Sequence, residues 1–250
     1  MTASIRETSN RSFYDVDSRS YDEQRWNSRG GAFTDRAQQT ILQSLCADWN
    51  GQRVLEVGPG TARFTIPLLQ KQNRMTLTDI SPGMLAQART NIEAAGLGSQ
   101  VDAYVEHSIY ELPFDDNSFD HAISLNVFNH LERPGEALNQ LARVTKAGST
   151  LLFNYANLQS YYWLAARRIN QRKKAIGQDV YSTWERPSEM RRIIRDAGLE
   201  LVRVLGQVHV PRAMEKYPIR PVVFVLDKIS RRAPLQRLAP FHFCLCRKRV

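Results

Sequence analysis

The sequence lacks the cysteines that a disulfide-stabilised or zinc-binding domain needs. Its 250 residues include three cysteines, Cys46, Cys244 and Cys246, and the last two lie two positions apart in an alternating, strand-like pattern. An odd number with this spacing is a poor disulfide framework, and no set of metal ligands can be built from it. We therefore expect a cytoplasmic protein without a metal site.

Long hydrophobic runs are also missing. The most apolar short run covers residues 222–226, whereas a helix that crosses a bilayer needs about 20 apolar residues. Residues 1–10 are polar and lack the apolar core of a signal peptide. Both observations favour a cytoplasmic location.

Negative charge is scarce. The chain has 34 Lys and Arg residues against 25 Asp and Glu residues, which gives a net charge of +9. A basic surface attracts nucleic acids, anionic lipids or acidic small molecules, but it is equally often only a solvated face. No aromatic-rich RNA-binding motif accompanies the cations, so nucleic acid is not the expected partner. The cations gather late in the chain, at Arg167, Arg168, Arg172, Lys173, Lys174, Arg231, Arg232, Arg237, Arg247, Lys248 and Arg249.

What the sequence does contain is a regular alternation of strand and helix patterns. Strand patterns occupy residues 53–57, 75–79, 101–106, 119–125 and 149–155, and later 199–205 and 241–246. Helical patterns occupy residues 61–72, 81–95, 136–146 and 188–197. Ser81 has the right chemistry for an N-cap, with Pro82 at the first helical position. Such alternation predicts parallel strands with helices on both faces of the sheet.

Three segments fall outside this alternation. Residues 1–34 are mostly polar and are predicted to form an N-terminal arm or lid on a domain that spans residues 35–250. Residues 158–185 and 207–238 are predicted to be insertions on the substrate side. The amphipathic stretch at 221–232 is expected to pack as a cover on the sheet, and contact with a membrane surface is the alternative.

A glycine-rich turn follows the first predicted strand. Gly58 and Gly60 allow close approach of a ligand to the backbone, and the helix that follows offers free N–H groups. Asp79, at the end of the second strand, can accept hydrogen bonds from both ribose hydroxyls of an adenosine. A dinucleotide fingerprint needs a third small residue where Arg63 stands, which argues against NAD. A tight turn without a ligand is the structural alternative.

This stretch resembles motif I of the class I S-adenosylmethionine (AdoMet)-dependent methyltransferases, an acid followed by Gly-x-Gly-x-Gly. The matching residues are Glu56, Gly58 and Gly60, while Ala62 replaces the last glycine. The similarity covers roughly residues 45–156, with a weaker echo in 186–206. Further matching segments lie at residues 75–85, 112–120, 129–131 and 143–148.

The resemblance implies roles for the residues at matching positions. Glu56 would support the turn and face the amino group of AdoMet, and Asp79 would bind the ribose. Relatives often have an acid at the position of Ser108 to read the adenine amino group, so Ser108 or the N–H of Ile109 would serve here. The other implied cofactor contacts are Gly58, Gly60 and Thr61 at the methionine part, Ile80 and Met84 at the adenine, Asn126 near the methyl-donor end, and Tyr21 as a lid tyrosine.

His130 is the candidate general base. It follows the fourth predicted strand, at the edge where ligands bind in such sheets, and an imidazole accepts a proton readily near neutral pH. The alternative is that His130 caps or packs against the next helix. A positioned base accelerates the reaction by about 10²–10⁴-fold, or about 3–5 kcal/mol. Positioning the reactants contributes more, roughly 7–11 kcal/mol.

We therefore predict a Rossmann-like, doubly wound α/β domain with a seven-stranded, mostly parallel sheet and an antiparallel last strand. Its expected activity is methyl transfer from AdoMet to an O, N or C nucleophile of a small-molecule acceptor that is acidic or lipid-like. One alternative is an RNA or protein methyltransferase, but residues 124–128 (Ser-Leu-Asn-Val-Phe) lack the Asn/Asp-Pro-Pro-Tyr/Phe motif of enzymes that methylate the amino groups of bases. The other is a non-catalytic AdoMet-binding protein on the same fold.

Overall fold

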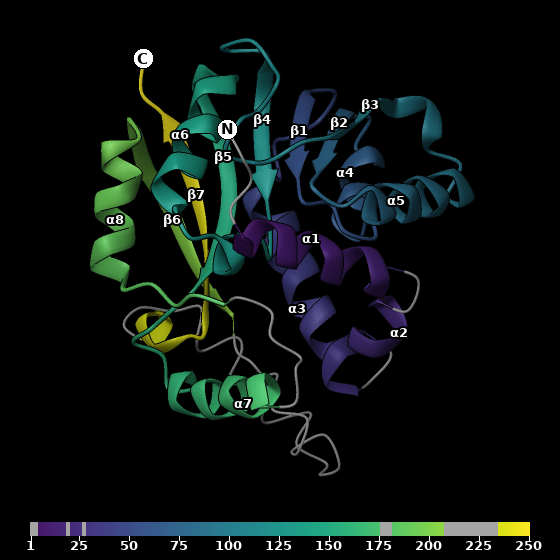
Figure 1. Ribbon diagram of the computed structural model, residues 1–250. Coiled ribbons are helices and arrows are strands. Elements are labelled where there is room, and N and C mark those ends of the chain that lie inside the picture. The colour runs from purple at the N-terminus through teal and green to yellow at the C-terminus, as the bar shows by residue number, and fades with distance from the viewer. Residues whose placement is uncertain (1–4, 19–20, 27–28, 176–181, 208–234) are drawn as a thin grey trace.

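A seven-stranded sheet organises the computed structural model, which describes residues 5–18, 21–26, 29–175, 182–207 and 235–250 (Figure 1). The strand order is β3-β2-β1-β4-β5-β7-β6. Strands β1 to β5 pair in parallel, and β7 is antiparallel to both β5 and β6. The predicted α/β fold and its antiparallel last strand are confirmed. The strands are β1 (Arg53–Val57), β2 (Arg74–Asp79), β3 (Val101–Glu106), β4 (Phe119–Ser124), β5 (Thr145–Ala156), β6 (Leu199–Gln207) and β7 (Phe241–Lys248).

Helices cover both faces of the sheet because alternate strand residues face opposite sides. Val54 packs with α3 (Arg29–Leu45), α4 (Thr65–Leu69) and α5 (Pro82–Ala94) in one apolar core. Its neighbour Leu55 packs with α6 (Pro134–Val144) and α8 (Pro187–Asp196) in the other. Strand β1 lies between β2 and β4, so the chain reverses its direction of travel across the sheet next to β1. Ligands of open α/β sheets bind at this switch point, outside the carboxyl ends of the strands.

The helix predicted at residues 61–72 is shorter in the structure, where α4 begins at Thr65. The backbone before it is a turn, with positive φ values of 74° at Gly58, 56° at Gly60 and 68° at Ala62. A helix cannot start through such residues, so the first four predicted positions belong to the turn. The next helix begins as predicted: Ser81 caps α5 by accepting the N–H of Met84 at 3.1 Å, and Pro82 is its first residue.

The N-terminal arm is more ordered than its composition suggests. It forms α1 (Ile5–Asp17) and α2 (Tyr21–Arg25), and α3 already begins at Arg29. The Asp15 carboxylate accepts the Gly83 N–H at 3.1 Å and the Ser81 hydroxyl, both at the start of α5. A carboxylate is favourable there because it meets free N–H groups and the positive end of the helix dipole. This contact fixes α1 against α5.

The first predicted insertion contains α7 (Trp163–Ala175), which lies beyond the carboxyl ends of the parallel strands (Figure 1). Most of the second predicted insertion, including the amphipathic stretch at 221–232, lies outside the described residues. Short 3-10 helices occur at η1 (Gly98–Gln100), η2 (Phe128–His130) and η4 (Leu235–Leu238). Among the described residues, no helix combines the length and the apolar character that crossing a bilayer requires.

Candidate functional site

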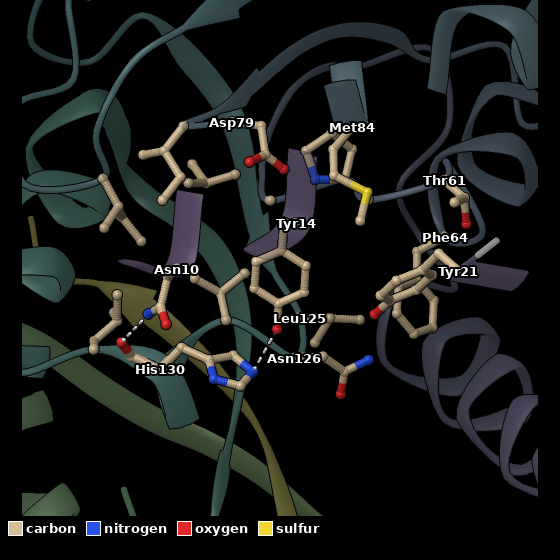
Figure 2. Close-up of a pocket in the computed structure, with 18 of the residues that line it drawn as sticks. Asn10, Tyr14, Tyr21, Thr61, Phe64, Asp79, Met84, Leu125, Asn126 and His130 are labelled. Carbon is tan, nitrogen blue, oxygen red and sulfur yellow. Dashed lines mark hydrogen bonds between the residues drawn. The ribbon is translucent and has the colours of Figure 1, made fainter. Parts of the chain in front are cut away.

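A pocket lies at the carboxyl ends of β1, β2 and β4, and residues of α1 and α2 contribute to its wall (Figure 2). It encloses about 1050 Å³, including the part that is open to solvent. Two predicted site residues, Glu56 and Ser108, are not part of its lining. The predicted site residues that do line it are Tyr21, Gly58, Gly60, Thr61, Asp79, Ile80, Met84, Ile109, Asn126 and His130.

The glycine turn forms one wall of this pocket. The Gly58 N–H donates to the Thr78 carbonyl at 2.8 Å, which ties the end of β1 to β2. A Cβ at Gly58 would lie 2.3 Å from Cγ2 of Val127, so no larger residue fits without movement. A Cβ at Gly60 would meet no atom within 4 Å. The turn is therefore closed at Gly58 by the segment that follows β4, and it leaves free space beside Gly60.

Asp79 lies deep in the pocket, with part of its surface open to it. Backbone N–H groups of Ser81, Gly60 and Ile80 donate to its carboxyl, the first at 3.0 Å. Burial outweighs these hydrogen bonds and raises the pKa of Asp79 to about 6. A desolvated carboxylate with remaining acceptor capacity suits a ligand that brings hydroxyl donors, as a ribose diol does.

Glu56 lies behind the turn and out of the pocket. Its side chain is buried, and Oε2 accepts the Thr65 hydroxyl at 2.6 Å, which links β1 to α4. Burial raises the pKa of Glu56 to about 7. The structure thus gives Glu56 a contact that supports the turn, and its predicted contact with a cofactor amino group stays a prediction.

Replacing Glu56 with glutamine tests this arrangement. A carboxyl whose pKa is raised on folding favours the folded state when it is protonated, so the wild type loses stability as pH rises from about 4.5 to about 7. Glutamine keeps an acceptor for Thr65 and has no such loss. We expect the free energy of unfolding of Glu56→Gln, relative to that of wild type, to rise by about 2–3 kcal/mol between about pH 5 and about pH 8, as measured by urea unfolding. Glu111→Gln, at an exposed position, is the control and should show no such gain; parallel pH curves for Glu56→Gln and wild type would contradict the expectation.

His130 ends η2 and its side chain lines the pocket opposite Asp79 (Figure 2). Its Nε2 lies 3.0 Å from the Tyr14 hydroxyl and 2.9 Å from the Asn129 amide nitrogen. The Asn10 amide donates to the His130 carbonyl at 3.3 Å, so α1 contacts both ends of this residue. An amide donor facing Nε2 favours the neutral tautomer with its lone pair on that nitrogen. His130 does not cap the next helix, whose N-cap is Arg133.

Several buried polar atoms in the pocket lining have no hydrogen-bond partner among the described residues. They are Oδ1 of Asn10, Nε1 of Trp26 and Nδ1 of His107. Buried polar groups in folded proteins are nearly always paired. Three such atoms belong to residues that line one pocket.

Asn126 follows β4 in the left-handed backbone region, with φ of 61°. Its N–H donates to Oδ1 of Asn154 at 2.6 Å, and the Asn154 amide donates back to Oδ1 of Asn126 at 3.0 Å. Asparagine tolerates this backbone conformation better than most residues. The reciprocal pair fixes the shape of the chain where it enters the pocket. Ser108, outside the lining, accepts the Tyr110 N–H at 3.2 Å in the turn after β3.

Apart from Tyr21, the sequence patterns missed the pocket residues of the N-terminal segment, and they missed the place of Arg63 in the pocket lining. Asn10 and Tyr14 are four positions apart, so they share one face of α1. The Arg63 guanidinium lies 4.0 Å from the Trp26 ring centroid and is paired with Asp35. The four-residue spacing of Asn10 and Tyr14 was the signal in the sequence that they share a helix face. The sequence does not indicate that this face of α1 meets the pocket.

Comparison with known proteins gives the family. Residues 55–153 match the family model described as "Methyltransferase domain". The ubiquinone/menaquinone biosynthesis C-methyltransferase UbiE of Roseobacter denitrificans is 31% identical over 183 residues, which cover 64% of this chain and 72% of the relative. The ubiquinone biosynthesis O-methyltransferase of Azoarcus sp. is 26% identical over 166 residues, covering 64% of this chain and 70% of the relative.

Solved structures agree on the fold. The magnesium protoporphyrin IX methyltransferase of Synechocystis PCC 6803, with bound SAH, has a TM-score of 0.66 and 16% identity, and the alignment covers 98% of each chain. AdoMet is the methyl donor of this family. The protein thus belongs to the class I AdoMet-dependent methyltransferases, in the branch that acts on small molecules.

Proposed function

We propose that the protein transfers the methyl group of AdoMet to a hydroxyl-bearing, apolar small molecule inside this pocket. The observation that carries the proposal is that one pocket contains both the Gly58–Gly60 turn with Asp79 and the His130–Tyr14 pair. The first set suits a nucleoside cofactor, and the second suits a group that gives up a proton.

For the cofactor, the proposal assigns the ribose to Asp79. Its carboxylate has hydrogen-bond acceptors to offer and lies beside the turn, where Gly60 leaves open space for the methionine part. Ile80, Met84 and Ile109 supply apolar surface for the adenine ring. The remaining predicted contacts keep their assignments, with Thr61 at the methionine part, Asn126 near the methyl-donor end and Tyr21 as a lid residue.

Arg63 extends this assignment to the carboxylate of the methionine part. It is a half-buried cation in the pocket lining, held by Asp35 and stacked on Trp26. An arginine stacked on an aromatic ring keeps its N–H donors in fixed directions, which suits recognition of a carboxylate. The large Arg63 side chain, which argues against a dinucleotide at this position, could therefore bind the carboxylate of AdoMet.

When bound, AdoMet supplies an activated methyl group on its sulfonium, so the protein needs mainly to position the acceptor. The Tyr14 hydroxyl donates to the Nε2 lone pair of His130, which the Asn129 amide also faces, and can accept a hydrogen bond from an acceptor hydroxyl in the pocket. As the acceptor attacks, its proton passes to the Tyr14 oxygen while the Tyr14 proton passes to His130. The proton leaves later to solvent, which balances the loss of positive charge at sulfur.

The acceptor is proposed to be apolar because most of the pocket surface is apolar. Val57, Leu125, Val127 and Leu131 line the pocket together with Tyr110. Relatives named for ubiquinone biosynthesis support a lipid-like aromatic acceptor over an acidic one. A phenol or an enol fits because its hydroxyl is acidic enough to be activated by a histidine, for methylation at oxygen or at an adjacent carbon.

Two measurements test the proposal in sequence. Calorimetry with AdoMet and with NAD should give heat of binding for AdoMet alone. A screen with methyl-labelled AdoMet should then place label in apolar phenols or enols, and not in amines, RNA or proteins of the same extract. Binding of AdoMet without label in any compound would favour a non-catalytic protein, and label confined to amines or macromolecules would contradict the proposed acceptor.

A further inference from the structure

Exposed apolar side chains gather at one place on the described surface. Large hydrophobic residues with more than a third of their surface exposed are Tyr161 (57%), Leu164 (59%), Val202 (44%), Leu238 (49%) and Val250. Three of these lie together, because the Tyr161 N–H donates to the Leu238 carbonyl at 3.3 Å and Leu164 follows in the first turn of α7. Isolated exposed hydrophobic residues need no explanation, whereas a group marks an interaction site.

Exposed cations extend this apolar group along α7. Leu164, Arg168 and Arg172 are four positions apart, so they lie on one face of the helix, and all three are exposed. Arg167 and, on η4, Arg237 are exposed beside them. Helix α7 contains no acidic residue. We call Tyr161, Leu164, Arg168, Arg172, Arg237 and Leu238 the α7–η4 patch.

The patch lies on the functional side of the molecule. Helix α7 lies beyond the carboxyl ends of the parallel strands, and α1, α2 and α3 lie toward the same ends of the strands (Figure 1). The pocket is at these carboxyl ends, between the sheet and the N-terminal helices. A surface that meets the patch therefore lies beyond the same ends of the strands as the pocket does.

We propose that the α7–η4 patch docks the protein onto an anionic lipid surface. Apolar side chains such as Leu164 and Leu238 enter the boundary between headgroups and acyl chains, while arginines beside them bind the lipid phosphates. Nucleic acid is the less suitable partner, because leucine gains nothing against a sugar-phosphate backbone. The inference goes beyond methyl transfer and does not depend on which acceptor is methylated.

Vesicle sedimentation tests this inference with the full chain. Wild type should bind vesicles of phosphatidylcholine and phosphatidylglycerol in equal parts, bind phosphatidylcholine vesicles much less, and be released by high salt. Leu164→Asp should lower the partition coefficient at least about tenfold, because one apolar anchor is replaced by a charge of the wrong sign. Arg168→Gln with Arg172→Gln should lower it about 25-fold, since about 1 kcal/mol per cation is about fivefold.

Matched controls lie on β6, where Val202 and Arg203 are both exposed. Val202→Asp and Arg203→Gln should leave vesicle binding within about twofold, and calorimetry should give unchanged AdoMet affinity in every variant. Vesicle binding that is absent in wild type, or equal in patch and control variants, would overturn the inference. RNA binding in place of vesicle binding would also overturn the inference, if Leu164→Asp left the affinity for RNA unchanged. Because AdoMet affinity is measured separately, failure here is distinct from failure of the proposed function.

Discussion

Replacing His130 with glutamine is expected to lower kcat by about 10²–10⁴-fold while AdoMet affinity stays within about twofold. Glutamine keeps a polar side chain that can hydrogen-bond Tyr14 and Asn129, so the pocket keeps its shape. Glutamine cannot take up a proton, so the proposed proton transfer from the acceptor hydroxyl through Tyr14 has no final acceptor. Steady-state kinetics and calorimetry on the same preparation separate the two effects.

The Tyr14 hydroxyl gives a second test of the proposed proton route. Tyr14→Phe should also lower kcat without changing AdoMet affinity, because the hydroxyl that contacts Nε2 of His130 at 3.0 Å is removed. Tyr104→Phe, outside the pocket, is the control. A His130→Gln enzyme with wild-type kcat would exclude His130 as the base.

Replacing Asp79 with alanine is expected to lower AdoMet affinity by about 10- to 100-fold. The carboxylate is proposed to accept hydrogen bonds from both ribose hydroxyls, and hydrogen bonds to charged groups contribute about 1.5–3 kcal/mol. Calorimetry measures the loss directly, and Asp196→Ala at an exposed position of α8 is the control. Unchanged affinity in Asp79→Ala would contradict the assignment of the ribose.

The pH dependence of AdoMet binding gives an independent check on Asp79. Burial raises its pKa to about 6, so the carboxyl becomes protonated as pH falls through that value. Protonation removes acceptor capacity, and AdoMet affinity should therefore decline below about pH 6 in wild type. Asp79→Asn cannot titrate and should lack this decline, at a lower affinity throughout. A decline that persists in Asp79→Asn would assign the pH effect to another group.

The sheet was predictable because its strands are short apolar runs separated by strong turn and cap signals. Gly58, Gly60 and Asp79 were predictable as one site because they end neighbouring parallel strands, whose carboxyl ends meet at the same edge. The length of α4 was not predictable, because the backbone at Ala62 is left-handed although the residue is not a glycine. An alanine in a sequence does not indicate such a conformation.

The part of the site contributed by α1 could not be predicted for a different reason. Asn10 and Tyr14 meet His130 across 120 and 116 positions of the chain. The polar composition of residues 1–34 predicts an arm without a core, and the helices there are held by contacts that local patterns do not encode. Asp15, which meets Ser81 and Gly83 at the start of α5, is the clearest example.

A crystal structure with bound S-adenosylhomocysteine (SAH), the product that AdoMet leaves, would locate the cofactor in the pocket. We expect the ribose hydroxyls within about 2.6–3.2 Å of the Asp79 carboxylate, the amino-acid end against the Gly58–Gly60 turn, and the sulfur facing His130 and Tyr14. A ligand bound elsewhere on the protein, or in this pocket with its ribose turned away from Asp79, would contradict the account.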